Sequence, residues 1–348
     1  MLKKIKTSIH KKVLVALSGG VDSAVTACLL KKQGYSVTGI YFKFSNKSDG
    51  HIDALKVCKK LGIPFQVCDF KKIFKKEIII PFLKAYQKGL TPNPCVICNE
   101  KVKFALLLKK ALVLKIDMIA TGHYVNIKKQ KNIYTLLSGD DKNKDQIYFL
   151  YRLNQNILKH TLFPLGIYTK EQVRQLARKY QLPVAEKNES QEICFLKNIG
   201  VEPFLKNNIK SNTKGLILDS DNNKLGEIKN IYSYTLGQRL PIGGNGPYYA
   251  VKKDLNKKII IAGKKNDPLL FQTKFKINNI NWISGIAPKM PLYLMVQTRY
   301  HGVVSKAYLQ KNKNEILVTL SKKIPRAVSG QSAVFYQKNK ILGGGIII

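Results

Sequence analysis

The sequence predicts an α/β protein in which an N-terminal parallel β-sheet with helices on both faces is followed by β-rich domains. Before about residue 200, short apolar runs alternate with stretches of helical periodicity, which is typical of a parallel sheet. From about Lys214, short β-like runs are separated by DSDNN, GGNGP and QKNKN, and no long helical pattern returns. A chain of 348 residues is long enough for two or three such domains.

The elements of the N-terminal half can be placed in order. Within LVALSGGVDSAV (residues 14–25), the apolar run predicts a buried strand that ends in a glycine-rich turn, and residues 24–32 predict a helix. Further strands are expected at residues 36–44, 64–70 and 117–123. Helices are expected at residues 52–62, in a stretch ending near Lys88, and from Asn99 to about Leu114.

Three segments of this half lie where a parallel sheet binds ligands, at the carboxyl ends of its strands. They are SGGVDS, residues 41–43 and residues 121–123. Residues 124–138 then predict a hairpin, and Thr169 with Gln172 predicts a capping box at the start of a helix that ends near Pro183. We expect domains at residues 1–200, 201–272 and 273–348.

The charge of the chain is strongly positive, with 60 Lys and Arg against 21 Asp and Glu and a formal net charge of +39. Such a balance favours a polyanionic partner, above all nucleic acid. The excess is nearly all Lys and accompanies many Ile and Asn, so codon bias in an AT-rich genome is an alternative explanation. The charge supports a nucleic-acid partner without establishing one.

The cysteine pattern and the hydropathy of the chain bear on its compartment. Six cysteines in so long a chain do not resemble a disulfide framework, so a conspicuous cysteine is expected to be reactive or a metal ligand. The basic N-terminus is not followed by an apolar segment of signal-peptide length, and no stretch approaches the roughly 20 apolar residues of a membrane span. A cytoplasmic protein is expected.

The segment SGGVDS (residues 18–23) lacks the Lys of a Walker A loop, yet its amides and the following helix start can form an anion nest. Ser18 and Ser23 add hydroxyl donors. Asp22 would repel a phosphate unless Mg²⁺ lay between them, so its presence suggests a metal–nucleotide complex. The alternative is an ordinary tight turn. SGGVDS resembles the PP-loop of ATP pyrophosphatases, which implies α/β phosphate cleavage of ATP.

A second conspicuous stretch is TPNPCVICNEKVKF (residues 91–104). Its two prolines flank Asn93 and keep the backbone out of a helix, and Asn99 is expected to cap the helix that follows. Because Cys98 then lies near a helix start and among lysines, we expect a lowered thiol pKa and a thiolate nucleophile. A structural zinc half-site is the alternative, although the sequence has no second cysteine pair at zinc spacing.

A third stretch, ESQEICFL, contains Cys194. A single cysteine beside Phe195 is commonly part of a core. Its polar neighbours at residues 189–192 favour an exposed loop instead.

Taken together, SGGVDS, TPNPCVICN, ATGHY, KDQIYFL, SQEICF, YTLGQR, GQSAVFY and GGGII resemble, in order and over nearly the whole chain, the tRNA-specific 2-thiouridylase family. The resemblance implies an N-terminal domain like that of the adenine nucleotide alpha hydrolases and a β-barrel-like C-terminal domain. It also implies ATP-dependent 2-thiolation of the wobble uridine, with adenylation of its C2 oxygen and sulfur transfer from a cysteine persulfide.

The resemblance also implies binding residues. ATP and its adenosine would be bound by Ala16, Leu17, Ser18, Gly19, Gly20, Val21, Asp22, Ser23, Phe42 and Gly122. The tRNA and its target base would be contacted by Asn93, Pro94, Cys95, His123, Lys144, Asp145, Gln146, Arg299, Tyr300 and Gln331. The alternatives are a strand-end histidine bonded to backbone for His123, and a solvated barrel surface for Arg299, Tyr300 and Gln331.

The catalytic roles implied by the resemblance fall on two cysteines. Cys194 would carry the persulfide, and Cys98 would attack it and form a disulfide with Cys194 as the sulfur leaves. The implied cofactors are ATP and Mg²⁺. The implied partners are the anticodon arm of glutamine, glutamate and lysine tRNAs and a cysteine desulfurase or sulfur-carrier protein as sulfur donor, with no membrane involved.

Cys95 departs from part of the family, because some members have Asp at this position. A carboxylate role is therefore not expected here. Cys95, Cys98 and Cys194 could instead hold three irons of a [4Fe-4S] cluster. The remaining cysteines, Cys28, Cys58 and Cys68, lie in apolar patterns and are expected in the core.

Two other functions remain open from the sequence. One is a different PP-loop enzyme, such as an amidating synthetase that uses ammonia. The other is a tRNA-binding protein that has lost catalysis. The intact PP-loop and the two cysteine stretches favour the thiolating enzyme over both.

Overall fold

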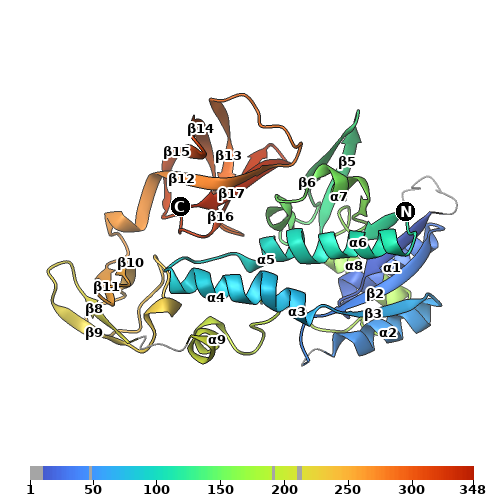
Figure 1. The fold of residues 1–348 in the computed structure, drawn as a ribbon, viewed down its shortest axis with the longest axis horizontal. Coiled ribbons are helices and arrows are strands. Elements are labelled where there is room, and N and C mark those ends of the chain that lie inside the picture. The colour runs from blue at the N-terminus through green and yellow to red at the C-terminus, as the bar shows by residue number, and fades with distance from the viewer. Residues whose placement is uncertain (1–10, 47–48, 190–192, 210–213) are drawn as a thin grey trace.

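The computed structural model describes residues 11–46, 49–189, 193–209 and 214–348. Within these residues the strands form three sheets (Figure 1). In the view of Figure 1 the N-terminal sheet lies on the right, the C-terminal barrel at the top and the small central sheet at the lower left. Two long helices run between the N-terminal sheet and the central one.

The N-terminal sheet is parallel throughout and has the strand order β3-β2-β1-β4-β7. Its strands are β1 (Lys12–Ala16), β2 (Ser36–Lys43), β3 (Phe65–Asp69), β4 (Met118–Ala120) and β7 (Thr161–Leu162). This confirms the predicted parallel sheet. The two-residue β7, which follows the short helix α7 (Gln155–Lys159), was not expected from the sequence.

Helices cover both faces of this sheet. Val13 and Val15 of β1 pack into one cluster with α1 (Val21–Lys32) and α2 (Gly50–Leu61), while Leu14 packs on the opposite face with α6 (Ala105–Val113). The helix α8 (Lys170–Lys179) packs beside α1. Its predicted capping box is confirmed, since Gln172 N donates to Thr169 Oγ1 over 3.3 Å and Thr169 N donates to Gln172 Oε1 over 2.9 Å.

Each of the two long helices contains a π-helical turn. The first joins α3 (Lys71–Phe74), a π turn (Lys75–Ile79) and α4 (Ile80–Gln87). The second joins α5 (Pro94–Ile97), a π turn (Cys98–Phe104) and α6. Phe74 and Ile78 of the first pack against Cys98 and Val102 of the second.

The predicted start of the second helix at Asn99 is wrong. The helix begins at Pro94 and Asn93 is its N-cap residue, because a proline suits the first turn, where an amide hydrogen would have no intrahelical partner. Asn99 is therefore buried inside the helix, where its Nδ2 donates to Phe149 O over 3.2 Å. Cys98 lies one turn inside the helix and not at its start.

The C-terminal strands close into a six-stranded antiparallel barrel, as the resemblance implies. The closed order is β12-β15-β14-β13-β16-β17 and back to β12. The strands are β12 (Phe271–Trp282), β13 (Leu292–Gln297), β14 (Val304–Asn312), β15 (Glu315–Pro325), β16 (Ser332–Gln337) and β17 (Lys340–Ile347). Val296, Leu309, Val318 and Phe335 are fully buried in its interior.

The predicted hairpin consists of β5 (Val125–Gln130) and β6 (Ile133–Ser138), and it extends the barrel sheet. Leu137 of β6 pairs with Lys340 of β17. One apolar cluster contains residues of the N-terminal sheet together with Val334 and Ile341 of the barrel. The N-terminal half and the barrel therefore share a core.

The central region has a four-stranded sheet in the order β10-β11-β8-β9. Its strands are β8 (Gly215–Leu218), β9 (Lys224–Ile228), β10 (Tyr249–Asp254) and β11 (Ile259–Gly263), and α9 (Val201–Asn208) precedes them. Short 3₁₀ helices occur at Ile147–Leu150, Ile231–Ser233 and Pro268–Leu270. Among the helices of the described ranges, none has both the length and the apolar character needed to cross a membrane.

The three cysteines expected in the core differ slightly in burial. Cys28 and Cys58 are buried, as predicted. Cys68 is half-buried and packs against the edge of the main core.

Candidate active site

The PP-loop connects β1 to α1 and is shaped by its first glycine. Gly19 has a φ of +78°, and a Cβ at this position would lie 2.4 Å from Gly50 O. Gly20 is the N-cap residue of α1 and forms no side-chain cap hydrogen bond. The first amides of a 12-residue helix are thus left for an anion, as expected for a phosphate-binding loop.

The serines of the loop hold its shape. Ser18 N donates to Ser23 Oγ over 3.1 Å, and Gly20 N donates to Ser18 Oγ over 3.3 Å. Ser23 Oγ donates to Gly20 O over 3.0 Å. These bonds fix the loop around the amides that would face the phosphates.

Gly122 and Phe42, the two residues expected to contact the adenosine, differ in their position relative to the strands. Gly122 follows β4 and lies so close to α1 that a Cβ on it would be 2.9 Å from Ser23 N. Phe42 lies within β2, because that strand continues to Lys43. Its side chain is 9% exposed and packs against Phe70 with ring centroids 4.9 Å apart.

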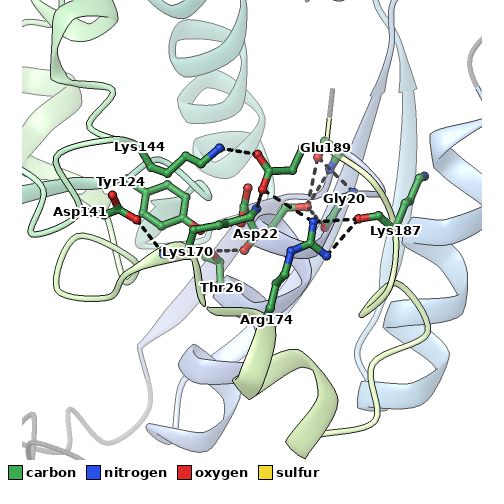
Figure 2. A network of polar contacts seen from close by, with 12 residues as sticks. Gly20, Asp22, Thr26, Tyr124, Asp141, Lys144, Lys170, Arg174, Lys187 and Glu189 are labelled. Atoms are coloured by element: carbon green, nitrogen blue, oxygen red, sulfur yellow. Dashed lines mark hydrogen bonds and ion pairs between the residues drawn. The ribbon is translucent and has the colours of Figure 1, made fainter. Parts of the chain in front are cut away.

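A charged network surrounds Asp22 of the PP-loop (Figure 2). Asp22 Oδ1 accepts hydrogen bonds from Lys170 Nζ over 2.6 Å and from Tyr124 Oη over 2.7 Å. Lys170 Nζ also lies 3.1 Å from Glu189 Oε1. Lys144 Nζ donates to Glu189 Oε2 over 2.7 Å, and Arg174 Nη2 lies 3.7 Å from Glu189.

This network changes the interpretation of Asp22. The Lys170 ammonium balances its charge, so Mg²⁺ is not the only cation that allows a carboxylate beside the phosphates. A magnesium–nucleotide complex takes most of its ligands from phosphates and water and needs only one or two carboxylates. Asp22 fits that requirement, and Mg²⁺ would arrive as part of the ATP substrate.

Glu189 remains ionised within the network. Burial tends to raise the pKa of its carboxyl, but the hydrogen bonds from Lys144 and Lys170 prevail and lower it. The segment that carries Glu189 also contacts the loop directly, because Lys187 Nζ donates to Gly19 O over 3.0 Å and pairs with Asp53. The sequence does not reveal Lys170, Arg174 or Lys187 as site residues, since nothing in it places α8 beside α1.

The structure places Cys98 and Cys194 near enough to interact electrostatically, although they lie far apart in the chain. Cys98 is 5% exposed and belongs to the apolar cluster between the two long helices. Phe195 packs against that same cluster, with its ring centroid 5.9 Å from that of Phe74. It also packs against Phe82 of a neighbouring cluster, with ring centroids 5.2 Å apart. Cys194 itself is exposed, as the polar neighbours predict, while residues 190–192 lie outside the described residues.

The expected lowering of the Cys98 pKa is wrong. Burial raises the pKa of this thiol to about 12, and the nearby Lys103 ammonium opposes the rise without overcoming it. The early helix start adds to the difference, because Cys98 does not face uncapped helix amides. Burial also raises the pKa of Cys95. Lys103 belongs to the predicted stretch, but the sequence alone does not distinguish it from its neighbours Lys101 and Lys109.

His123 also interacts electrostatically with Lys103. Burial and the Lys103 charge lower its pKa to about 3, so its ring is neutral. Its Nδ1 lies 2.8 Å from Thr121 Oγ1, and its ring centroid lies 5.5 Å from that of Phe104. The partner of His123 is thus a side chain, and not backbone as the alternative expected.

The cysteines do not form a metal site. Across the described ranges, no three His, Cys, Asp or Glu side chains gather so that they could hold a metal ion. The six cysteines are free thiols. The described residues therefore give no support to the [4Fe-4S] cluster or to the zinc site that the sequence left open.

The residues expected at the target base meet the barrel. Tyr148 forms a hydrogen bond with Asn93 and interacts electrostatically with Arg299. Gln331 Nε2 donates to Thr91 O over 2.9 Å, and the Tyr300 ring lies 4.5 Å from that of Phe149. A cavity of about 310 Å³ at this junction is lined by Thr91, Thr235, Leu236, Gly237, Gln238, Thr298, Arg299, Arg326, Val328 and Gln331.

The side chains of Lys144, Asp145 and Gln146 all have partners within the chain. Lys144 pairs with Glu189, Asp145 Oδ1 accepts from Ile147 N over 3.0 Å, and Gln146 Oε1 accepts from Tyr124 N over 3.2 Å. These contacts support the network at the PP-loop. Contact of these three residues with tRNA stays a prediction.

Known families match all three parts of the chain. Residues 11–198 match the family described as "tRNA methyl transferase HUP domain", residues 202–264 match "tRNA methyl transferase PRC-barrel domain", and residues 272–347 match "Aminomethyltransferase beta-barrel domain".

Curated relatives match over almost their full length. The chain is 40% identical to the tRNA-specific 2-thiouridylase MnmA 2 of Clostridium tetani, over 97% of this chain and 99% of the relative. It is 41% identical to the tRNA-specific 2-thiouridylase MnmA of Halothermothrix orenii, over 97% and 98%. For MnmA of Karelsulcia muelleri the identity is 40%, over 97% and 99%. With this likeness along its whole length, the chain belongs to the tRNA-specific 2-thiouridylase family.

Proposed function

We propose that the protein catalyses ATP-dependent 2-thiolation of the wobble uridine of tRNA. The observation that supports the proposal is the electrostatic interaction between Cys98 and Cys194, together with the packing of Phe195 against the cluster that contains Cys98. This pair of cysteines adjoins the PP-loop, because Gly122 lies against the start of α1 and the next residue, His123, interacts with Lys103. Membership of the family supports the same reaction.

In the first step of the proposed reaction, the uridine is activated. The amides at the start of α1, at the end of the PP-loop (residues 16–23), bind the phosphates of MgATP, and Lys170 adds a positive charge beside them. The C2 oxygen of the uridine attacks the α-phosphorus of ATP, and pyrophosphate leaves. The C2 oxygen, otherwise a poor leaving group, is now bound to AMP.

In the second step, sulfur replaces the activated oxygen. A sulfur donor protein has left a persulfide on Cys194, which the exposure of this residue permits. The terminal persulfide sulfur attacks C2 and AMP departs. The Cys98 thiolate then attacks the Cys194 sulfur, the S–S bond to the transferred sulfur breaks, and its electron pair stays with the sulfur of 2-thiouridine. A thiol reductant supplies two electrons to reduce the resulting Cys98–Cys194 disulfide.

The tRNA is proposed to bind where the N-terminal half meets the barrel. The target base has to leave the anticodon-loop stack to reach the cysteines, which is the usual way enzymes reach a base. Asn93, Pro94, Cys95 and His123 would face it, and Arg299, Tyr300 and Gln331 would contact the adjoining backbone. We propose glutamine, glutamate and lysine tRNAs as the substrates and a cysteine desulfurase or sulfur-carrier protein as the sulfur donor. We also propose that the chain is divided into domains at residues 1–200, 201–272 and 273–348.

The test is mass spectrometry of nucleosides from unmodified glutamine tRNA incubated with the protein, MgATP and a cysteine-desulfurase sulfur source. We expect ATP-dependent 2-thiouridine, reduced on the order of a hundredfold or more in Cys98→Ser and in Cys194→Ser, as when a nucleophile is lost. Cys68→Ser is the matched control and retains activity, because this half-buried cysteine lies at the edge of the core.

The other outcomes point to the alternatives. Pyrophosphate release without 2-thiouridine would favour an amidating synthetase or another acceptor. Binding of tRNA without pyrophosphate release would favour a protein that has lost catalysis.

A further inference from the structure

Lys103 lies on the same helix as two of the cysteines. It follows Cys98 by five residues within the π turn Cys98–Phe104. Because hydrogen bonds in such a turn join residues five apart, Cys98 and Lys103 lie on the same side of the helix. Lys103 is half-buried, and the residues on either side of it, Val102 and Phe104, are fully buried.

The surroundings of Lys103 contain thiols and no carboxylate partner. Its charge interacts with Cys98, Cys95 and Cys194. It also lowers the pKa of His123, whose ring is therefore neutral. No ion pair joins Lys103 to an Asp or Glu of the described residues. Lys101, two residues earlier, differs in this respect, since it is exposed and its Nζ lies 3.2 Å from Glu77 Oε2.

Burying an ammonium group without a nearby anion costs free energy, because the charge loses part of its hydration. That free-energy cost falls when a negative charge forms beside the ammonium. At this position the groups that can acquire such a charge are the three thiols. The buried Cys98 thiol has most to gain, because burial disfavours its thiolate. A persulfide on Cys194 would be a second anion within reach of the same ammonium.

We propose that Lys103 is a positioning residue for sulfur transfer, whose ammonium stabilises the thiolate of Cys98 and the persulfide anion of Cys194 in one centre. The persulfide part rests on the proposed function, whereas the thiolate part does not. Lys103 forms no covalent bond and keeps its proton throughout. When Cys98 attacks the Cys194 sulfur, the negative charge passes from Cys98 to the departing sulfur, and the ammonium interacts with both.

The experiment measures the alkylation of Cys194 by iodoacetamide as a function of pH, on the reduced full-length protein, by peptide mass spectrometry. Cys194 is the probe because its side chain is exposed. The surrounding protein raises the pKa of its thiol, and the Lys103 charge opposes that rise. In Lys103→Met we expect the midpoint of the profile to move up by about half to one pH unit, with the plateau at high pH unchanged. A purely structural role would change the plateau instead.

Three variants complete the design. Lys103→Arg keeps the charge and restores the midpoint. Lys101→Met is the matched control on the same helix and leaves the midpoint unchanged. Lys103→Gln replaces the Met variant if the latter fails to fold by circular dichroism.

The same midpoint in wild type and in the neutral variants of Lys103 overturns the proposal. Because alkylation requires neither tRNA nor ATP, this result is independent of whether the protein forms 2-thiouridine. In the thiolation assay we expect kcat to fall about tenfold in Lys103→Met with KM for ATP unchanged. A rise in that KM alone would contradict the assignment.

Discussion

The two cysteines of the proposed sulfur-transfer centre differ in how far solvent reaches them. Cys194 is exposed, so a donor protein can reach it, whereas Cys98 is 5% exposed inside a helix. A buried thiol with a raised pKa resists oxidation and stray modification, because the thiolate is the reactive form. The arrangement suits a residue that reacts only with its own partner.

Lys170 is the residue at which the ATP site can be tested most directly. In Lys170→Met, Asp22 loses the cation that balances it and would repel the incoming phosphates. We expect KM for ATP to rise about tenfold in a pyrophosphate-release assay. Lys179→Met, in the last turn of the same helix and exposed, is the matched control and leaves this KM unchanged. An unchanged KM in Lys170→Met would count against a role for this network in ATP binding.

At the residue scale, the sequence identifies the groups that carry their own chemical signature. The sequence motifs around Cys98, Cys194 and Asp22 identify these residues as candidate site residues. Lys103 and Lys170 do not, because their importance depends on what packs against them. The error at the start of the second helix has the same cause, since Pro94 is compatible both with a break and with a first helical turn.

The PP-loop depends on a backbone conformation at Gly19 that other residues resist. In Gly19→Ala, the left-handed φ of +78° is combined with a Cβ 2.4 Å from Gly50 O, so the loop has to move. We expect a loss of about 2 kcal/mol or more in unfolding free energy and loss of pyrophosphate release.

Gly34 provides the matched control for that variant. Its φ is +86°, but a Cβ there would have no atom within 4 Å. Gly34→Ala is expected to cost only the backbone term of about 1 kcal/mol and to retain activity. Thermal unfolding of both variants measures the loss of stability in each. Equal losses of unfolding free energy in Gly19→Ala and Gly34→Ala would contradict the role of the Gly50 contact.

At the element scale, alternation of apolar runs predicts the parallel sheet and the β-rich tail, and both are confirmed. The strand order and β7 cannot be read from the same pattern, because hydrophobic periodicity reports burial and not neighbours. The pairing of the β5–β6 hairpin with the barrel is hidden for the same reason.

The charge of the whole molecule yields a test of its partner. If the lysines contact tRNA phosphates, affinity depends on the release of counterions. We expect the Kd for tRNA to rise by at least about 10³-fold between 50 and 200 mM salt, as for proteins with several phosphate contacts. Filter binding over this range measures it. A flat dependence would assign most of the +39 charge to codon bias.

The pairing of β6 with β17 joins an early segment of the chain to one of the last segments to be synthesised. Leu137 in the hairpin pairs with Lys340, and Tyr148 Oη donates a hydrogen bond to Ser332 O over 2.9 Å. In both pairs the second residue is synthesised long after the first. The ribosome therefore synthesises the PP-loop and both cysteines before the strands that complete the proposed base-binding side. Contacts so distant in sequence form late in folding. Under the proposed function, a nascent chain that lacks these strands is expected to bind tRNA poorly and so to have no substrate to adenylate.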